Sequence, residues 1–127
     1  MKRLTKAEEQ VMQVLWRLKK AYVRDILDQL PRPKPAYNTV STIIRILEKK
    51  GFVGYNAHGK THEYFPLVTK KSYRKNFFKG FLNLYFGNSY QALTSFFTKE
   101  ENLTINELED IRNLIDEEIK RKSQETN

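Results

Sequence analysis

Residues 36–51, AYNTVSTIIRILEKKG, constrain the fold of this chain most, because they have the pattern of a helix with two different faces. Apolar side chains recur at three- and four-residue steps, the spacing of one helix face, at Val40, Ile43, Ile44 and Leu47. The opposite face carries hydroxyl, amide and basic groups at Tyr37, Asn38, Ser41, Thr42 and Arg45. Such groups bond base edges and phosphates, and this face has no acidic side chain to repel a duplex. Taken alone, the pattern fits a helix that contacts DNA and an ordinary solvated helix surface equally well, and the neighbouring segments decide between them.

The residues before this segment predict two more helices. Thr5 and Glu8 have the spacing of a capping box, and the apolar period that follows predicts a first helix to about Leu18. A second, short helix follows from Val23 and is stopped by Pro31, which cannot continue a helix. Three helices with a compact link between the second and third are typical of a helix-turn-helix.

The residues after the segment change period and predict a β-hairpin. Gly51 can end the third helix, and residues 52–55 and 63–65 are β-prone. The stretch between them, residues 56–62, is rich in turn formers, and its Gly59 can adopt a positive φ. Three helices followed by a hairpin with a basic tip form the winged-helix arrangement. We therefore expect a mainly α fold with a small β hairpin, a winged helix-turn-helix followed by a C-terminal helical region.

From Thr69 onward the helical period returns and predicts three further helices, the last opened by a capping box of Thr104 and Glu107. The first of them has two apolar stripes, and these need two different surfaces to cover them. The simplest way to cover both stripes is contact with a second copy of the chain, and a two-fold dimer suits palindromic DNA. The residues expected at this dimer surface are Phe77, Phe78, Phe81, Leu82, Tyr85, Leu93, Phe97, Leu108, Ile111 and Ile115. We thus predict a DNA-binding domain over residues 1–68, a helical dimerisation domain over 69–122 and a polar tail over 123–127.

The charge of the chain is unevenly distributed. Residues 1–80 hold 18 basic and 6 acidic side chains, a net charge of +12, whereas residues 81–127 hold 5 and 9, a net charge of −4. A basic half suits a polyanionic partner, and the opposite sign of the other half indicates a different one. The chain has no cysteine, no signal-like start and no apolar run of the roughly 18 residues that cross a bilayer, so we expect a soluble cytoplasmic protein.

The predicted DNA contacts lie on the third helix and at the hairpin tip: Tyr37, Asn38, Thr39, Ser41, Thr42, Arg45, Lys49, His58 and Lys60. Asn pairs with adenine and Arg with guanine, although Arg45 can instead clamp a phosphate. His58 and His62 are four residues apart, but a third ligand is not evident, and we expect no metal or other cofactor. Lys71, Lys75 and Lys79 repeat at four-residue steps and fit a solvated helix face better than a contact with DNA.

In this order of motifs the chain resembles the BlaI/MecI-type repressors, the penicillinase and methicillin-resistance regulators, over nearly its full length. The resemblance is carried by residues 4–8 with Val11, Met12 and Trp16, by Thr39, Val40, Thr42 and Leu47, by residues 49–53, by Tyr64 with residues 66–68, and by residues 96–97 and 100–104. It implies a homodimeric repressor of a palindromic operator in double-stranded DNA, without a small-molecule substrate. It also implies that a membrane-bound sensor protease, or events that depend on it, lifts repression when a β-lactam is present, by cutting the repressor within its dimerisation helices.

The chain departs from that family at two places. The family's third helix often starts with Ser-Pro, where this chain has Ala36 and Tyr37, so the first residue that reads DNA is left open. The family's cut falls between Asn and Phe, and the matching pair here is Phe96 and Phe97. This pair is the candidate cleavage site.

Two other classes of function compete with a repressor. The basic, aromatic stretch of residues 70–86 could serve as an amphipathic anchor in a membrane-surface or protein-interaction module that lacks sequence-specific DNA binding. Sedimentation with anionic liposomes distinguishes the two hypotheses, because a membrane-surface module should sediment with the liposomes whereas a repressor should stay in solution when DNA is absent. An enzyme is not expected, because the chain has no phosphate-binding glycine loop, no metal-ligand cluster and no nucleophile in a known motif.

Overall fold

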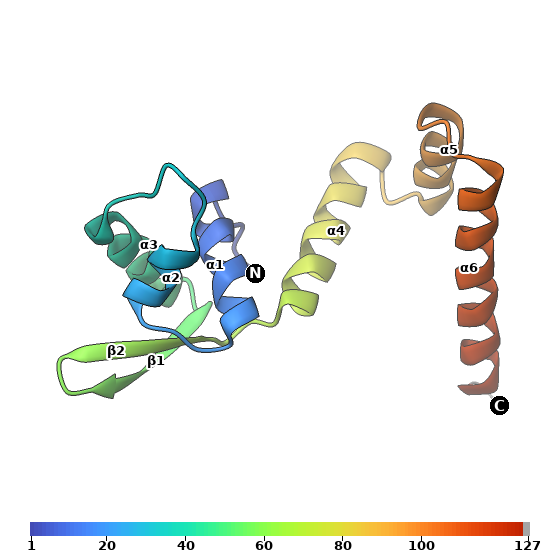
Figure 1. Ribbon diagram of the computed structural model, residues 1–127. Coiled ribbons are helices and arrows are strands. Elements are labelled where there is room, and N and C mark those ends of the chain that lie inside the picture. Colours follow the sequence, from blue (N-terminus) through green and yellow to red (C-terminus); the bar gives the residue numbers. More distant parts are fainter. Residues whose placement is uncertain (126–127) are drawn as a thin grey trace. The chain divides into compact units, whose positions relative to one another are not determined.

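The computed structural model describes residues 1–125 and contains six helices and one hairpin within them (Figure 1). The residues form two compact units, unit 1 over Met1–Phe78 and unit 2 from Lys79 onward. The elements are α1 (Lys6–Leu18), α2 (Val23–Gln29), α3 (Tyr37–Lys49), β1 (Val53–His58), β2 (Thr61–Pro66), α4 (Lys70–Phe86), α5 (Tyr90–Glu100) and α6 (Ile105–Glu125). The predicted mainly α fold with a small hairpin is confirmed.

The first helix begins at the predicted capping box. The backbone amide of Glu8 donates to Thr5 Oγ1 at 3.2 Å, and the amide of Thr5 donates to Glu8 Oε1 at 2.7 Å. Because two amides at the helix start gain partners inside the chain, α1 begins at a fixed residue. Its buried face includes Val11, Met12 and Leu15, each at most 1 % exposed.

The core of unit 1 lies between α1, α2, α3 and the base of the hairpin. Its largest fully buried side chains are Phe52, Met12, Leu15, Ile26, Ile44, Leu47, Val11, Val40 and Val53. Three of them, Val40, Ile44 and Leu47, belong to the apolar stripe that defined the third helix in the sequence, while Ile43 packs half-buried beside them. Burying this stripe fixes which face of α3 is left toward solvent.

The end of α3 is a Schellman motif. The amide of Phe52 donates to Leu47 O at 2.9 Å, and that of Gly51 donates to Glu48 O at 3.0 Å. Gly51 has a φ of +81°, which is the conformation this motif requires after the last helical residue. The chain therefore leaves α3 directly into β1, with Phe52 buried at the junction.

The hairpin is antiparallel and longer than predicted. Val53 pairs with Pro66 at one end and His58 with Thr61 at the other, so the loop has only two residues, Gly59 and Lys60. Gly59 takes a φ of +65°, and a Gly with positive φ at the first of two loop positions is typical of a type II′ turn. Most of the stretch expected as a turn is therefore paired strand, because a two-residue loop suffices to reverse the chain.

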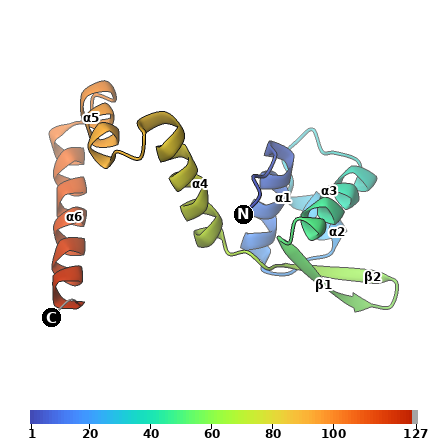
Figure 2. The same cartoon turned by 180° about the vertical axis from the view of Figure 1, so that it is seen from behind.

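A single isolated β-bridge joins Ala21 to the hairpin. The amide of Ala21 donates to Tyr64 O at 2.9 Å and the amide of Tyr64 donates to Ala21 O at 2.8 Å. The link between α1 and α2 is thereby tied to β2. Seen from opposite sides, α3 and the hairpin tip lie on the same side of unit 1, to the left in Figure 1 and to the right in Figure 2.

The first turns of α4 pack on the rest of unit 1. Trp16 Nε1 donates to Val68 O at 2.8 Å, and the Tyr73 hydroxyl donates to Glu9 Oε1 at 2.7 Å. Burial, followed by this bond to Glu9, raises the pKa of Tyr73 to about 12. The boundary between the units therefore falls within α4, later than the boundary predicted at residues 68/69.

Unit 2 contains the end of α4 with α5 and α6, and both later helices have side-chain caps. Ser89 Oγ accepts from the amide of Ala92 at 3.0 Å, and Thr104 Oγ1 accepts from the amide of Glu107 at 3.1 Å. The last helix continues to Glu125, so residues 123–125 of the predicted polar tail are helical, while 126–127 lie outside the described residues. Within residues 1–125, no helix combines the length and the apolar character needed to cross a membrane.

Candidate nucleic-acid interface

The polar face of α3 is open to solvent over its whole length. Tyr37, Asn38, Thr39, Thr42, Arg45 and Lys49 are exposed, and Ser41 is half-buried. The opposite face is held by Val40, Ile44 and Leu47, which are fully buried. Because that packing fixes the rotation of the helix, the seven polar and aromatic positions predicted from the sequence lie on one accessible surface.

Near its middle, α3 has a hydroxyl group that is bonded within the helix. Thr42 Oγ1 donates to Asn38 O at 2.9 Å, a bond to the preceding turn. The hydroxyl proton of Thr42 is thereby committed, and its oxygen lone pairs and methyl group remain for a duplex. A threonine held in this way suits contact with a thymine methyl or with a donor on a base edge.

The beginning of α3 lacks a side-chain cap. Ala36 has extended backbone angles and is the last residue before the helix, but its methyl group cannot accept a hydrogen bond. Helix starts without such a cap leave backbone amides for water or a ligand. At this same end of the helix, Arg24 of α2 lies over the aromatic ring of Tyr37, with its Cζ 5.6 Å from the ring centroid.

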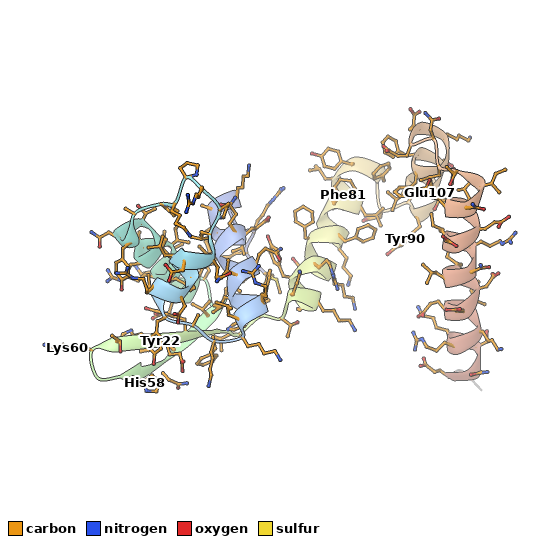
Figure 3. All side chains as sticks on the ribbon, in the orientation of Figure 1. Tyr22, His58, Lys60, Phe81, Tyr90 and Glu107 are labelled. Atoms are coloured by element: carbon orange, nitrogen blue, oxygen red, sulfur yellow. The ribbon has the colours of Figure 1, made fainter. Side chains whose placement is uncertain are left out.

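At the hairpin, Lys60 lies exposed in the two-residue loop (Figure 3). His58 Nε2 is 3.4 Å from Glu63 Oε1 across the hairpin, so this histidine already has an acceptor within the chain. Its ring also meets that of Tyr22, with centroids 6.1 Å apart. Of the two predicted wing contacts, Lys60 is therefore the one that has no competing partner within residues 1–125.

Two basic side chains near this surface have structural partners instead. Lys50 Nζ donates to both carboxylate oxygens of Glu8, at 2.8 and 2.9 Å. Lys34 Nζ donates to three backbone carbonyls at the end of α2, where the helix dipole favours a cation. The net positive charge of this half of the chain therefore overstates the number of cations that can reach a polyanion.

Glu8 and Tyr64 are the other groups of this region whose pKa departs from the usual value. Burial acts to raise the pKa of Glu8, but its hydrogen bonds with Lys50 and Thr5 outweigh that effect, and the pKa lies below the usual value. Burial raises the pKa of Tyr64, and the charge of Glu48 adds to it. Neither group is exposed, and both stabilise the scaffold beneath the α3 surface rather than the surface itself.

Tyr22, the residue before α2, and Arg24 in its first turn also lie at this surface and were not among the predicted residues. Their partners are Tyr37 and His58, which lie on other elements, so no local period or spacing could have paired them. The sequence signal was limited to an Arg near the start of a short helix. Only the packing of α2 against α3 and the hairpin reveals the contacts.

The predicted dimer residues divide by exposure in the single chain. Phe77, Phe78, Phe81, Tyr85, Phe97 and Ile115 are exposed, Leu93, Leu108 and Ile111 are half-buried, and Leu82 is buried at 3 %. Unit 2 also exposes apolar side chains that the prediction did not include, namely Leu84, Tyr90, Phe96, Ile105, Leu114 and Ile119. The predicted cleavage pair, Phe96 and Phe97, lies within α5, each at 45 % exposure.

No group of three potential metal ligands is found among residues 1–125. His58 and His62, whose spacing was considered in the sequence, lie on opposite strands of the hairpin and are engaged separately. His58 faces Glu63, whereas His62 stacks on Tyr55 with ring centroids 4.0 Å apart.

Comparison with known proteins gives a consistent result. The family model described as "Penicillinase repressor" matches residues 4–117. The methicillin resistance regulatory protein MecI of Staphylococcus aureus (strain N315) is 28 % identical over 113 residues, covering 88 % of this chain and 92 % of the relative. The penicillinase repressor of Bacillus licheniformis is 21 % identical over 122 residues, covering 95 % of each chain. The solved DNA-binding domain of the repressor BlaI has a TM-score of 0.50 at 25 % identity and covers 57 % of this chain and 94 % of that domain.

Proposed function

The chain belongs to the penicillinase repressor family, and we propose that it is a DNA-binding transcriptional repressor that acts as a homodimer on a palindromic operator. The observation that carries this proposal is the solvent-open polar face of α3, held in place by a fully buried apolar face and flanked by the hairpin tip. The relative named for its DNA-binding domain has the same fold at the matching part of the chain. We expect this role in the cytoplasm, where a bacterial chromosome lies.

In this proposal the two ends of the α3 surface make different kinds of contact with DNA. Asn38, Thr39 and Thr42 supply amide and hydroxyl groups of the kind that read base edges. Arg45 and Lys49, toward the end of the helix, together with Lys60 in the hairpin loop, supply cations for bases or phosphates. Phosphate contacts fix the register of the protein, and base contacts give it a preferred sequence.

Dimerisation is proposed from the apolar surface of unit 2. Leu114, Ile115 and Ile119 on α6 are 67 %, 54 % and 58 % exposed. Large exposed apolar patches are rare on monomers, and a second copy of the chain would cover these side chains with the same side chains of its own. Linking two half-site contacts raises affinity by about 10² to 10⁴ over one contact, so separating the dimer is an effective way to release DNA.

We further propose that a sensor protease relieves repression by cutting this chain. Phe96 and Phe97 are half-exposed on α5, within the region proposed to hold the dimer together. A protease binds its substrate as an extended strand, so this segment of α5 has to unwind before the bond between them is cut. Cleavage there would separate α6 from the DNA-binding unit.

Footprinting on DNA from the region upstream of the chain's own gene tests the function directly. We expect a protected site with two half-sites about one helical turn apart, 34–36 Å, as a two-fold dimer requires. Protection that spreads evenly along the duplex, or a single half-site, would contradict a dimeric, sequence-specific repressor.

A further inference from the structure

Arg24 in the first turn of α2 is an exposed arginine that lies over an aromatic ring of the candidate interface. Its Cζ lies 5.6 Å from the centroid of the Tyr37 ring, the first residue of α3. It makes no hydrogen bond and no ion pair with any group in residues 1–125. The neighbouring Asp25 is not its partner, and that carboxylate accepts from the Tyr22 amide at 3.0 Å. The guanidinium therefore lies over an aromatic ring, and its N–H donors have no acceptor within residues 1–125.

The position of this arginine joins the two parts of the candidate interface. Tyr37 belongs to the start of the α3 surface, and Tyr22, two residues before Arg24, has its ring 6.1 Å from that of His58 on the hairpin. The start of α2 thus contacts α3 through Arg24 and the hairpin through Tyr22. Figure 3 shows Tyr22 beside His58. A duplex that lies along α3 and reaches the hairpin has its backbone within reach of this turn.

We propose that Arg24 binds a backbone phosphate of the duplex and that Tyr37 is a positioning residue that holds the guanidinium for it. This rests on the DNA-binding role proposed above. A guanidinium is planar, so it stacks on a ring through its face and keeps its edge for two parallel bonds to phosphate oxygens. Stacking on Tyr37 restricts the long side chain before DNA arrives, and less rotamer freedom is then lost on binding. Tyr37 thereby acts through Arg24 and does not itself read a base.

The test measures affinity by fluorescence anisotropy for two probes at several salt concentrations. The probes are a 24-base-pair duplex of random sequence and the palindromic duplex that the wild-type protein prefers in a selection from a random library. For Arg24→Ala we expect binding to weaken about tenfold on both probes and the salt slope to become shallower by about 0.9 for each phosphate that the variant no longer neutralises. Arg17→Ala is the matched control, because Arg17 is an exposed arginine of α1 bonded to Gln29 and should change neither quantity.

Tyr37 is tested by a double-mutant cycle with Arg24. Tyr37→Phe keeps the ring and should bind within about twofold of wild type, whereas Tyr37→Leu removes it and should bind about two- to fivefold more weakly. In the Arg24→Ala background, Tyr37→Leu should have no further effect. Circular dichroism of every variant confirms that the helices are intact.

Two outcomes would overturn the proposal. Unchanged affinity and salt slope in Arg24→Ala would show that no phosphate is bound there. Equal losses of affinity from Tyr37→Leu with and without Arg24 would show that Tyr37 contacts DNA on its own. If the wild-type protein does not distinguish the two probes, the proposed repressor function fails, but the salt slope on the random duplex still decides the role of Arg24.

Discussion

Glu8 is the buried charge of unit 1, at 3 % exposure, and its environment shows how one residue can serve two purposes. It caps α1 together with Thr5 and accepts two hydrogen bonds from Lys50, the residue that follows α3. The pair therefore connects the start of the first helix to the end of the helix that carries the candidate interface. The capping box was readable in the sequence from the spacing of Thr5 and Glu8. The bond to Lys50 was not, because 42 residues separate the partners and local patterns carry no information on them.

The lowered pKa of Glu8 predicts a loss of stability in acid. Because the folded chain holds the carboxylate more strongly than the unfolded chain does, the unfolded state binds more protons between the lowered pKa and the usual value of about 4.5. The stabilisation is complete above that usual value and is lost as the pH falls through the folded pKa. Thermal melting from pH 7 to pH 3 should therefore show a steeper decline for the wild-type chain than for Glu8→Gln.

Glu101→Gln serves as the control for this experiment, because Glu101 is exposed. Its melting curve should follow that of the wild type at every pH. If Glu8→Gln keeps the same acid dependence as the wild type, the pair with Lys50 does not contribute in the way described.

At the level of elements, the junction between α3 and β1 connects the helix and the hairpin that together carry the candidate interface. Periodicity predicted α3 well, since a buried face of β-branched and leucine side chains is a strong signal. The hairpin was predicted as a type of element, but its loop was placed too wide. Asn56, Ala57 and His62 lie in the stretch predicted as a turn, yet all three are paired in strands. A residue's place in a strand depends on its partner across the sheet as well as on its own propensity. Local propensity could not foresee that pairing.

Gly51 provides a prediction at this level. Its φ is +81°, and a Cβ built on it meets nothing within 4 Å, so a substitution there costs backbone strain and no steric clash. We expect Gly51→Ala to destabilise unit 1 by about 1–2 kcal/mol, the cost of placing an L-residue in the left-handed region. Gly51→Asn should destabilise it less, because asparagine tolerates this conformation. Denaturant titration measures both, and equal losses of stability for Ala and Asn would argue against the strain explanation.

At the level of the whole molecule, the two units differ in how completely a single chain buries their apolar side chains. Unit 1 has a closed core, whereas the helices of unit 2 leave Leu84, Tyr90, Ile105 and Leu114 at 64 % exposure or more. The apolar excess of this region was evident in the sequence. Which side chains stay exposed was not, because that depends on how α5 and α6 cover one another. The predicted set included Leu82, which is buried within the chain, and omitted Ile105 and Leu84, which are 74 % and 70 % exposed.

The proposed dimer surface on α6 predicts the effect of a single added charge. Ile115→Lys should weaken self-association at least about tenfold, because a lysine would have to be desolvated where two apolar faces meet. Asn113→Lys adds the same charge at a polar, exposed position of the same helix and should leave the dimer intact. Sedimentation equilibrium at micromolar concentration measures both. A wild-type chain that sediments as a monomer, or identical behaviour of the two variants, would contradict this surface.

The central claim is that the exposed face of α3 recognises a DNA sequence, and one binding measurement tests it most directly. Affinities of the wild type, Asn38→Ala and Lys60→Ala are compared on the selected palindromic duplex and on random duplex at about 150 mM salt, where specific binding typically exceeds non-specific binding by at least about 10³. We expect the wild type to show such a preference and Asn38→Ala to reduce it by about 5- to 150-fold, as for one bidentate base contact. Lys60→Ala should weaken binding to both duplexes equally. No preference in the wild type, or an equal weakening on both duplexes for Asn38→Ala, would contradict the reading of bases by α3.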